Sequence, residues 1–205
     1  LGNAIANLHN AKRARSPMVN IVGDHATYHV HYDAPLTSDA EGLARPVSSW
    51  IRRSTSAETV GRDAAQAIAA SRTAPGGVAT LILPADTAWT DGGQVAAVPD
   101  IARPTPVPSS AVDAAARAAR EGAGTTLLLG HTALTPENLD LAGAIAAKTG
   151  CKLIAQVSNA RMARGAGRVP IDRIPYPLDL ALGTLKDVKR LVIVGTVLCV
   201  LLVGL

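Results

Sequence analysis

The sequence contains no phenylalanine, and only 2% of its 205 residues are aromatic. Proteins that hold single-stranded nucleic acid stack its bases on aromatic side chains, so this shortage argues against such a partner. The net charge of +4 does not change this view, because the basic residues are scattered along the chain. The densest basic cluster, residues 12–15, suits the solvated end of a helix. We therefore expect no nucleic-acid partner.

Cysteine is also scarce. Cys151 and Cys199 are too few and too far apart for a disulfide framework or a zinc cluster, and they favour a reducing, cytoplasmic compartment. No secretory leader is visible. Residues 191–205 carry no charge, but they fall short of the roughly 20 residues that a membrane-spanning helix needs. We expect a buried strand there rather than a tail anchor, and no membrane partner.

The first half of the chain alternates helical and strand-like patterns. Apolar residues make up 48% of the sequence and charged residues 18%, which is typical of globular proteins. Ser56 is the expected N-cap of a helix. The patterns predict a helix over 1–15, a strand over 18–23, a strand over 47–54, a helix over 56–70 and a strand over 78–83. Buried strands that alternate with helices predict a parallel sheet covered by helices on both faces.

The same pattern restarts after a segment rich in proline and glycine. Residues 89–109 hold four prolines and a Gly-Gly pair, which indicates an interdomain linker. The second half predicts a helix over 110–121, a strand over 125–130, a helix over 136–150 and strands over 152–157 and 190–195. We expect an α/β protein with two doubly wound parallel-sheet units, each a three-layer αβα sandwich, over residues 1–88 and 110–205.

A loop rich in histidine follows the first predicted strand. The apolar run Met18–Val22 ends at Gly23-Asp24, and the next residues include three of the five histidines of the chain. In open α/β sheets, ligands bind just past the carboxyl ends of the strands. Histidine is suited to acid–base chemistry because its pKa lies near neutral pH. This loop is therefore the first candidate for a functional site.

Three stretches of the chain resemble a known enzyme family. Residues 1–50, from LGNAIANLHN to RPVSSW, resemble the second half of the pyrimidine-binding domain of thiamine-diphosphate-dependent enzymes, in the acetolactate synthase large subunit-like and benzoylformate decarboxylase-like branch. VATLILPADTAW, residues 78–89, resembles the last strand of that domain. Residues 125–182 resemble the central domain. The resemblance implies a partial pyrimidine-binding domain over 1–88 and a truncated central domain over 110–205.

The resemblance implies an activity and a set of site residues. The parent enzyme would be a lyase or transferase that decarboxylates a 2-keto acid, with thiamine diphosphate and Mg²⁺, as a cytoplasmic homodimer or homotetramer. Gly2, Asn3 and Asp24 would bind the cofactor. His25 and His29 would be catalytic residues that face the substrate. The central domain could hold FAD or a nucleotide, with the arginines of residues 161–173 meeting a phosphate.

Two parts of the family pattern are not found in the chain. The glutamate that activates the cofactor would precede a Gly-Pro-Gly turn, and the chain starts just after the position of that turn. The Gly-Asp-Gly…Asn segment that holds the diphosphate and its metal has no counterpart. We therefore expect a fragment that is inactive alone and that holds no metal of its own.

Two other functions compete with this interpretation. The run His29-Val30-His31-Tyr32-Asp33 could chelate a metal in a hydrolase, because alternate side chains of an extended segment share a face. Pro35 and the lack of a further histidine weigh against it. The second alternative is a non-catalytic nucleotide-binding or assembly module. Cys151, Trp50 and Trp89 are expected to be packing residues.

Overall fold

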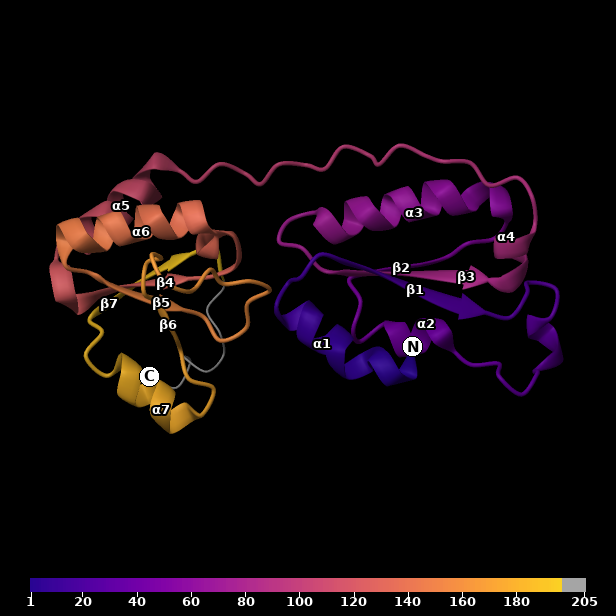
Figure 1. Cartoon of the computed structure of the whole chain (residues 1–205), viewed down its shortest axis with the longest axis horizontal. Helices are drawn as coiled ribbons and strands as arrows, with labels where there is room; N and C mark the ends of the chain where they lie inside the picture. The colour runs from indigo at the N-terminus through magenta and orange to yellow at the C-terminus, as the bar shows by residue number, and fades with distance from the viewer. Residues whose placement is uncertain (197–205) are drawn as a thin grey trace. The chain divides into compact units, whose positions relative to one another are not determined.

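The structure, a computed structural model, describes residues 1–196. The chain divides into two compact units, Leu1–Pro104 and Thr105–Leu205. Each unit is built on a parallel sheet with helices on its faces, so the predicted α/β class is confirmed (Figure 1). The assignment of these units to a pyrimidine-binding and a central domain, with a linker over 89–109, stays a prediction.

The sheet of the first unit has three parallel strands in the order β1-β3-β2. Figure 1 shows α3 on one face of this sheet and α1 and α2 on the other, which gives three layers. The elements are η1 (Gly2–Ala4), α1 (Ile5–Arg13), β1 (Met18–Asp24), η2 (Val30–Tyr32), α2 (Ala40–Ala44), β2 (Trp50–Arg53), α3 (Ala57–Arg72), β3 (Val78–Pro84) and α4 (Ala85–Trp89).

The central strand β3 forms the core of this unit, whereas β1 lies at an edge of the described sheet. Val78, Leu81 and Ile82 of β3 are at most 1% exposed, because helices cover both faces and strands flank both sides. The prediction that residues 18–23 form a buried strand is correct for the strand but wrong for its burial. Ile21 is 64% exposed, because β1 has a neighbouring strand on one side only.

The longest helix of the first unit, α3, is fixed to the sheet by a buried carboxylate. Asp63 is 3% exposed, accepts a hydrogen bond from the hydroxyl of Ser54 at 2.9 Å and pairs with the guanidinium of Arg52 at 3.0 Å. Ser56 occupies the N-cap position of α3 as predicted, although its side chain accepts no hydrogen bond from a helix N–H. A hydrogen bond from Ser56 instead lowers the pKa of Glu58.

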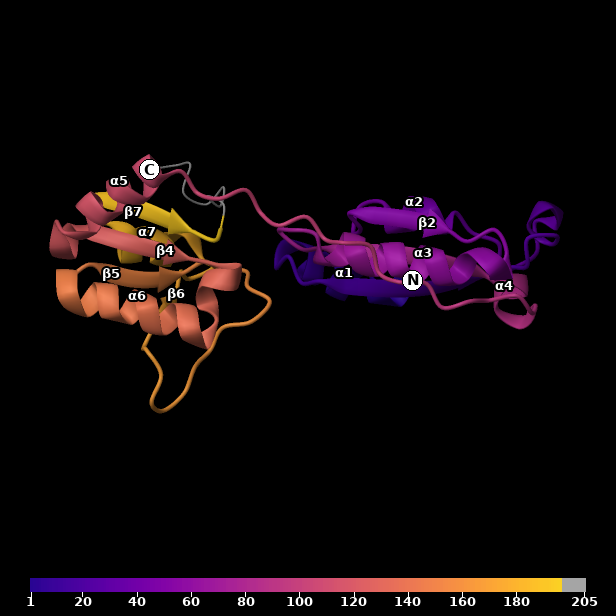
Figure 2. The ribbon, with the colours of Figure 1, turned by 90° about the horizontal axis from the view of Figure 1, so that it is seen from above.

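The second unit has four parallel strands in the order β6-β5-β4-β7. Helices α5 and α6 lie on one face of this sheet and α7 on the other (Figures 1 and 2). Thr135 caps α6 through its hydroxyl, and Pro136 occupies the first turn as predicted. The elements are α5 (Ser109–Ala119), η3 (Gly122–Gly124), β4 (Thr125–Leu129), η4 (His131–Leu134), α6 (Pro136–Thr149), β5 (Lys152–Ala155), β6 (Asp172–Arg173), α7 (Leu178–Leu185) and β7 (Arg190–Val194).

The core of the second unit lies on both faces of β4. Leu127 and Leu129 pack in the cluster beneath α5 and α6, and Leu128 packs with Ile154 and Leu185 on the other face. Cys151 is buried in the first of these clusters, as expected. This packing on both faces explains why all five residues of β4 are buried and none is charged, since a strand covered on both faces has no solvent-facing side.

The predicted strand at the end of the chain is confirmed only in part. Residues 190–194 form β7, although Ile193 and Val194 are each 40% exposed, so this edge strand is not fully buried. Cys199 and the rest of the apolar tail over 197–205 lie outside the described residues. Within residues 1–196, no helix has both the length and the apolar character that crossing a membrane requires.

The buried carboxylate gives a first test of the fold. Replacing Asp63 with alanine removes the partner of Ser54 and Arg52, so we expect the free energy of unfolding of the first unit to fall by about 2–3 kcal/mol. Both tryptophans, Trp50 and Trp89, lie in this unit, so urea unfolding followed by tryptophan fluorescence reports on it alone.

The matched control for this measurement is Asp113→Ala. Asp113 is an exposed residue of α5 in the other unit, so its loss should change the midpoint of the tryptophan transition by almost nothing. Equal midpoints for the two variants would contradict the role given to Asp63.

Candidate functional site

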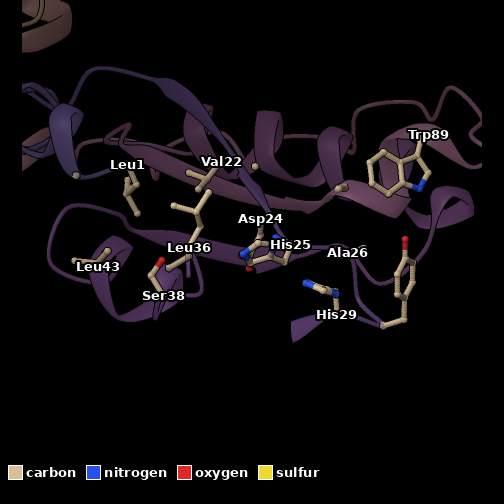
Figure 3. Close-up of a pocket in the computed structure, with 15 residues that line it drawn as sticks. Leu1, Val22, Asp24, His25, Ala26, His29, Leu36, Ser38, Leu43 and Trp89 are labelled. Carbon is tan, nitrogen blue, oxygen red and sulfur yellow. The ribbon is translucent and has the colours of Figure 1, made fainter. Parts of the chain in front are cut away.

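A cavity of about 550 Å³ opens at the carboxyl end of β1. Its walls come from the start of the chain, the end of β1, the histidine loop, α2 and α4, all within the first unit. Figure 3 shows His25 between Leu36 on one side and Trp89 on the other. The cavity thus lies where the strand-end rule places ligands in α/β proteins.

Asp24, one of the residues that line the cavity, is held in an ion-pair network. One oxygen of Asp24 accepts a hydrogen bond from the backbone N–H of His25 at 2.9 Å, and the other pairs with the Nη1 group of Arg53. The Nε group of Arg53 also pairs with Glu41 of α2 at 3.3 Å. Burial acts to lower the pKa of Arg53, but the hydrogen bonds and charges of Asp24 and Glu41 outweigh it and raise that pKa. The guanidinium therefore stays charged and fixes the start of the histidine loop.

His25 is the side chain best placed for chemistry. Its Nε2 atom is buried and has no hydrogen-bond partner in the part of the chain that the structure describes. A buried polar atom without a partner costs free energy, so a ligand that bonds to it gains that energy back. His29 stands beside it, with its ring centre 5.5 Å from that of His25. The two imidazoles together offer a proton donor or acceptor at the cavity wall.

The metal-site hypothesis requires an extended segment over residues 29–33, and the geometry of the loop does not support this. Residues 30–32 form the 3-10 turn η2 rather than an extended segment, so alternate side chains do not share a face. The ring of His31 packs against Tyr32, with 3.9 Å between their centres. Across residues 1–196, no group of three or more His, Cys, Asp or Glu side chains is arranged to hold a metal ion.

A second tether holds the histidine loop to α4. Asp86 accepts a hydrogen bond from the backbone N–H of Thr27 at 2.9 Å and another from its hydroxyl at 2.5 Å. These bonds stabilise the charged carboxylate, so they lower the pKa of Asp86. Trp89 of the same helix lines the cavity and is 67% exposed, so its predicted role as a packing residue is wrong.

The remaining wall of the cavity is apolar and lies along one edge of the opening. Val22, Ala40 and Leu43 line it from β1 and α2, and Leu36 stands at the rim with 82% of its surface exposed. An apolar wall with a few convergent polar atoms is typical of sites for small organic ligands and cofactors. The cavity can therefore bind a flat, partly polar ring against its wall.

The structure brings together most of the predicted site residues. Gly2, Asp24, His25 and His29 all line the cavity, whereas Asn3, in η1, does not. Sequence reasoning missed Arg53 and Trp89. Arg53 lies near the end of the strand predicted over 47–54, as Asp24 follows the strand predicted over 18–23, so the rule that parallel strands end at one edge could have found it. Trp89 could not be found this way, because α4 gives too short a pattern to predict.

The second unit places polar side chains at the carboxyl ends of its strands. The Nε2 atoms of Gln156 and His131 lie 3.2 Å apart, and Asn159 donates to the backbone carbonyl of Gln156 at 2.7 Å. The strand order turns between β4 and β7, which is the position where open sheets bind nucleotides. Arg161, Arg164 and Arg168 are exposed on the loop that leaves β5.

Comparison with solved structures defines the class of fold. A “putative thiamin diphosphate-dependent enzyme” of Mycobacterium smegmatis matches with a TM-score of 0.75 and 22% identity, over 94% of this chain and 38% of that one. A thiamine diphosphate-dependent 4-hydroxybenzoylformate decarboxylase of Rhodococcus jostii matches with a TM-score of 0.73 and 19% identity, over the same shares. The fold is therefore the one found in thiamine-diphosphate-dependent enzymes.

Sequence comparison names a nearer relative. The chain is 46% identical over 196 residues to “Putative acetolactate synthase large subunit IlvX” of Mycobacterium tuberculosis. No protein-family model matches the chain. The chain is thus a homologue of an acetolactate synthase large subunit-like protein, and the resemblance predicted from its sequence is confirmed. The match takes in 95% of this chain but only 37% of the relative, so the chain corresponds to a part of that protein.

The tether between Thr27 and Asp86 predicts a pH dependence. A carboxylate with a lowered pKa stabilises the folded loop above the usual value of 3.8, and that stabilisation is lost as the pH falls through the lowered pKa. We expect the amide signal of Thr27 to change below pH 3.8 in a titration followed by nuclear magnetic resonance.

Threonine-to-valine variants separate this tether from general acid effects. In Thr27→Val the hydroxyl bond is gone, so the pKa of Asp86 should return toward 3.8. Thr90→Val should leave it unchanged, because the contact of Thr90 with Asp86 runs through backbone atoms. A titration of Asp86 that is the same in Thr27→Val as in the parent would refute the tether.

Proposed function

We propose that this chain forms the cofactor-facing part of a thiamine-diphosphate-dependent enzyme that acts on 2-keto acids, as a decarboxylase or a carboligase. One observation carries the proposal: four residues implied by the family resemblance, Gly2, Asp24, His25 and His29, line one cavity at the end of β1. The similarity to an acetolactate synthase-like protein supports the same conclusion.

The cavity fits the aminopyrimidine end of the cofactor. An aminopyrimidine is a flat ring with polar edges, and the cavity offers an apolar wall together with the unpartnered Nε2 atom of His25. Val22 and Leu36 would contact the ring face, and the space beside Gly2 is open to the ligand, because a Cβ built there meets no protein atom within 4 Å. Asp24 would act mainly through its hold on the backbone of His25.

The diphosphate and Mg²⁺ have no matching site among the described residues. Mg²⁺ needs carboxylate and other oxygen ligands in an octahedral arrangement, and residues 1–196 hold no cluster of three or more candidate ligands. We therefore propose that other residues of the parent enzyme hold this end of the cofactor, and that the chain is inactive alone.

The two histidines have separate tasks in the proposed site. When bound, the cofactor supplies the electron sink for decarboxylation of the 2-keto acid. His25 would hold a proton at Nε2 at the wall of the cavity, where water has little access. His29, which is exposed, would pass that proton to and from solvent.

The rim of the cavity supports an oligomeric parent enzyme. Tyr28 and Trp89 line the cavity, and both are more than 60% exposed. Tyr32, which is equally exposed, packs against His29 of the same lining, and the three are among only five aromatic residues in the chain. Exposed aromatic residues are enriched at protein interfaces. We propose that a second subunit of a homodimer or homotetramer covers this rim.

A bound FAD or nucleotide in the second unit is the one further ligand that a specific observation favours. Gln156, His131 and Asn159 gather polar atoms at the point where the strand order turns. The exposed arginines of residues 161–168 would meet its phosphates. Calorimetry with FAD and with ADP tests this proposal, since heat of binding to neither would contradict it.

Binding of the cofactor to the cavity is the direct test of the main proposal. Adding thiamine diphosphate with Mg²⁺ to the ¹⁵N-labelled chain should shift the amide signals of Gly2, Asp24 and His25. His25→Ala should weaken the affinity by about tenfold, because one hydrogen bond to a buried imidazole is lost.

His9→Ala is the control for this experiment, because His9 is exposed on α1 and does not line the cavity. Its affinity should equal that of the parent. Equal shifts on addition of ADP in place of thiamine diphosphate would contradict the proposal.

The activity of the isolated chain provides a separate test. We expect no release of carbon dioxide from pyruvate or benzoylformate in the presence of thiamine diphosphate and Mg²⁺, because the described residues offer no site for the metal. Measurable turnover that disappears in His25→Ala would show that the chain is active alone and would overturn that part of the proposal.

A further inference from the structure

The chain that follows α4 lies directly against α3. Figure 1 shows it passing along this helix. A Cβ atom built on Gly61, in the middle of α3, would lie 1.7 Å from the backbone oxygen of Gln94 and 3.5 Å from the backbone nitrogen of Ala96. No side chain can occupy that space, so the backbone of residues 94–96 touches the helix at its one glycine.

A second contact lies one turn earlier on the same helix. Gly92 has a φ of +118°, and a Cβ atom there would lie 3.0 Å from the carboxylate of Glu58. Gly93 lies close to the backbone oxygen of Ala57, at 3.7 Å from a Cβ built on it. Residues 57 and 61 are four apart, so they share one face of α3. Residues 92–96 therefore follow this face, and we call them the strap.

The strap is connected to the cavity through α4. Only Thr90 and Asp91 separate it from Trp89, and the amide of Thr90 donates to the backbone carbonyl of Asp86 at 3.1 Å. Asp86 holds Thr27 of the histidine loop, and Trp89 lines the cavity. A displacement of the strap would thus move Asp86, which holds the histidine loop, and Trp89, which lines the cavity.

We propose that the contact of the strap with Gly61 holds α4 in place, and that Gly61 is a positioning residue for the wall of the cavity. The contact itself does not depend on what the cavity binds, whereas its effect on cofactor affinity rests on the proposed function. Residues 92–96 belong with the first unit, which extends to Pro104.

Gly61 is otherwise unfavourable where it stands. Glycine in the middle of a helix loses more conformational entropy on folding than alanine does. Replacing such a glycine with alanine normally stabilises a helix. At Gly61 the added Cβ would overlap a backbone oxygen, which cannot turn aside as a flexible side chain can. The strap must therefore leave the helix in Gly61→Ala.

Nuclear magnetic resonance of the full chain tests the proposal without any ligand. In the parent we expect a nuclear Overhauser effect between the Gly61 Hα protons and the Ala96 amide, and amide relaxation over 92–96 that matches α3. In Gly61→Ala the effect should vanish and residues 92–96 should gain fast motion. The indole signal of Trp89 and the amide of Thr27 should shift, while the indole of Trp50 should not.

Two pairs of glycine variants keep the result interpretable. Gly183→Ala, in α7, is the control for Gly61→Ala, because a Cβ there meets no atom within 4 Å. If Gly61→Ala does not fold, Gly92→Ala disturbs the same contact by a change in the strap. An alanine at a φ of +118° is strained, and its Cβ would lie 3.0 Å from the carboxylate of Glu58. Gly93→Ala is the neighbouring control for Gly92→Ala, since that Cβ would make only an ordinary contact at 3.7 Å.

The outcomes separate this inference from the proposed function. Fast motion of residues 92–96 in the parent, or unchanged Trp89 and Thr27 signals in the strap variants, would overturn the inference whatever the cavity binds. If the parent binds thiamine diphosphate, Gly61→Ala should weaken that affinity at least threefold, and Gly183→Ala should not. An unchanged affinity in a variant whose strap is released would also overturn the inference. Failure of the parent to bind thiamine diphosphate would contradict only the proposed function.

Discussion

The ion pair between Asp24 and Arg53 is the interaction on which the candidate site depends. The two residues end strands β1 and β2, which do not pair with each other but flank the central strand β3. Their contact therefore joins the carboxyl ends of the sheet across β3, and Glu41 extends it to α2. Without it, the start of the histidine loop and the N-terminal turn of α2 would lose their common attachment. The same carboxylate accepts a hydrogen bond from the backbone N–H of His25, so this arrangement also fixes the backbone of that half-buried residue.

The sequence was sufficient to predict the two parallel sheets and the strand end at which the cavity opens. Runs such as residues 78–83 and 125–129 carry no charged side chain and are mostly aliphatic, and such runs occur where helices cover both faces of a strand. The short helices α2, α4 and α7 were not predicted, since five to eight residues carry too little periodicity. Two of these helices, α2 and α4, contribute Leu43 and Trp89 to the cavity, so this part of its wall could not be known from the sequence. The exposure of Ile21 could not be predicted either, because the burial of a strand depends on whether other strands flank it on both sides.

The two units contribute different features to the proposed activity. The first presents an apolar wall, a buried imidazole and exposed aromatic residues around one opening, which together suit a cofactor shared with another protein surface. The second presents polar side chains at a turn of the strand order, which suits a nucleotide. Within residues 1–196, neither unit gathers three or more candidate ligands for Mg²⁺. This division agrees with a chain that matches only 37% of its relative.

The central claim is that the histidine cavity receives the aminopyrimidine of thiamine diphosphate. Saturation-transfer difference spectroscopy on the full chain, with thiamine diphosphate as the ligand, measures which ligand protons lie against the protein. We expect the strongest saturation at the methyl and ring protons of the aminopyrimidine, and we expect this saturation to disappear in His25→Ala. Saturation confined to the thiazolium side, or equally strong in His25→Ala, would contradict it.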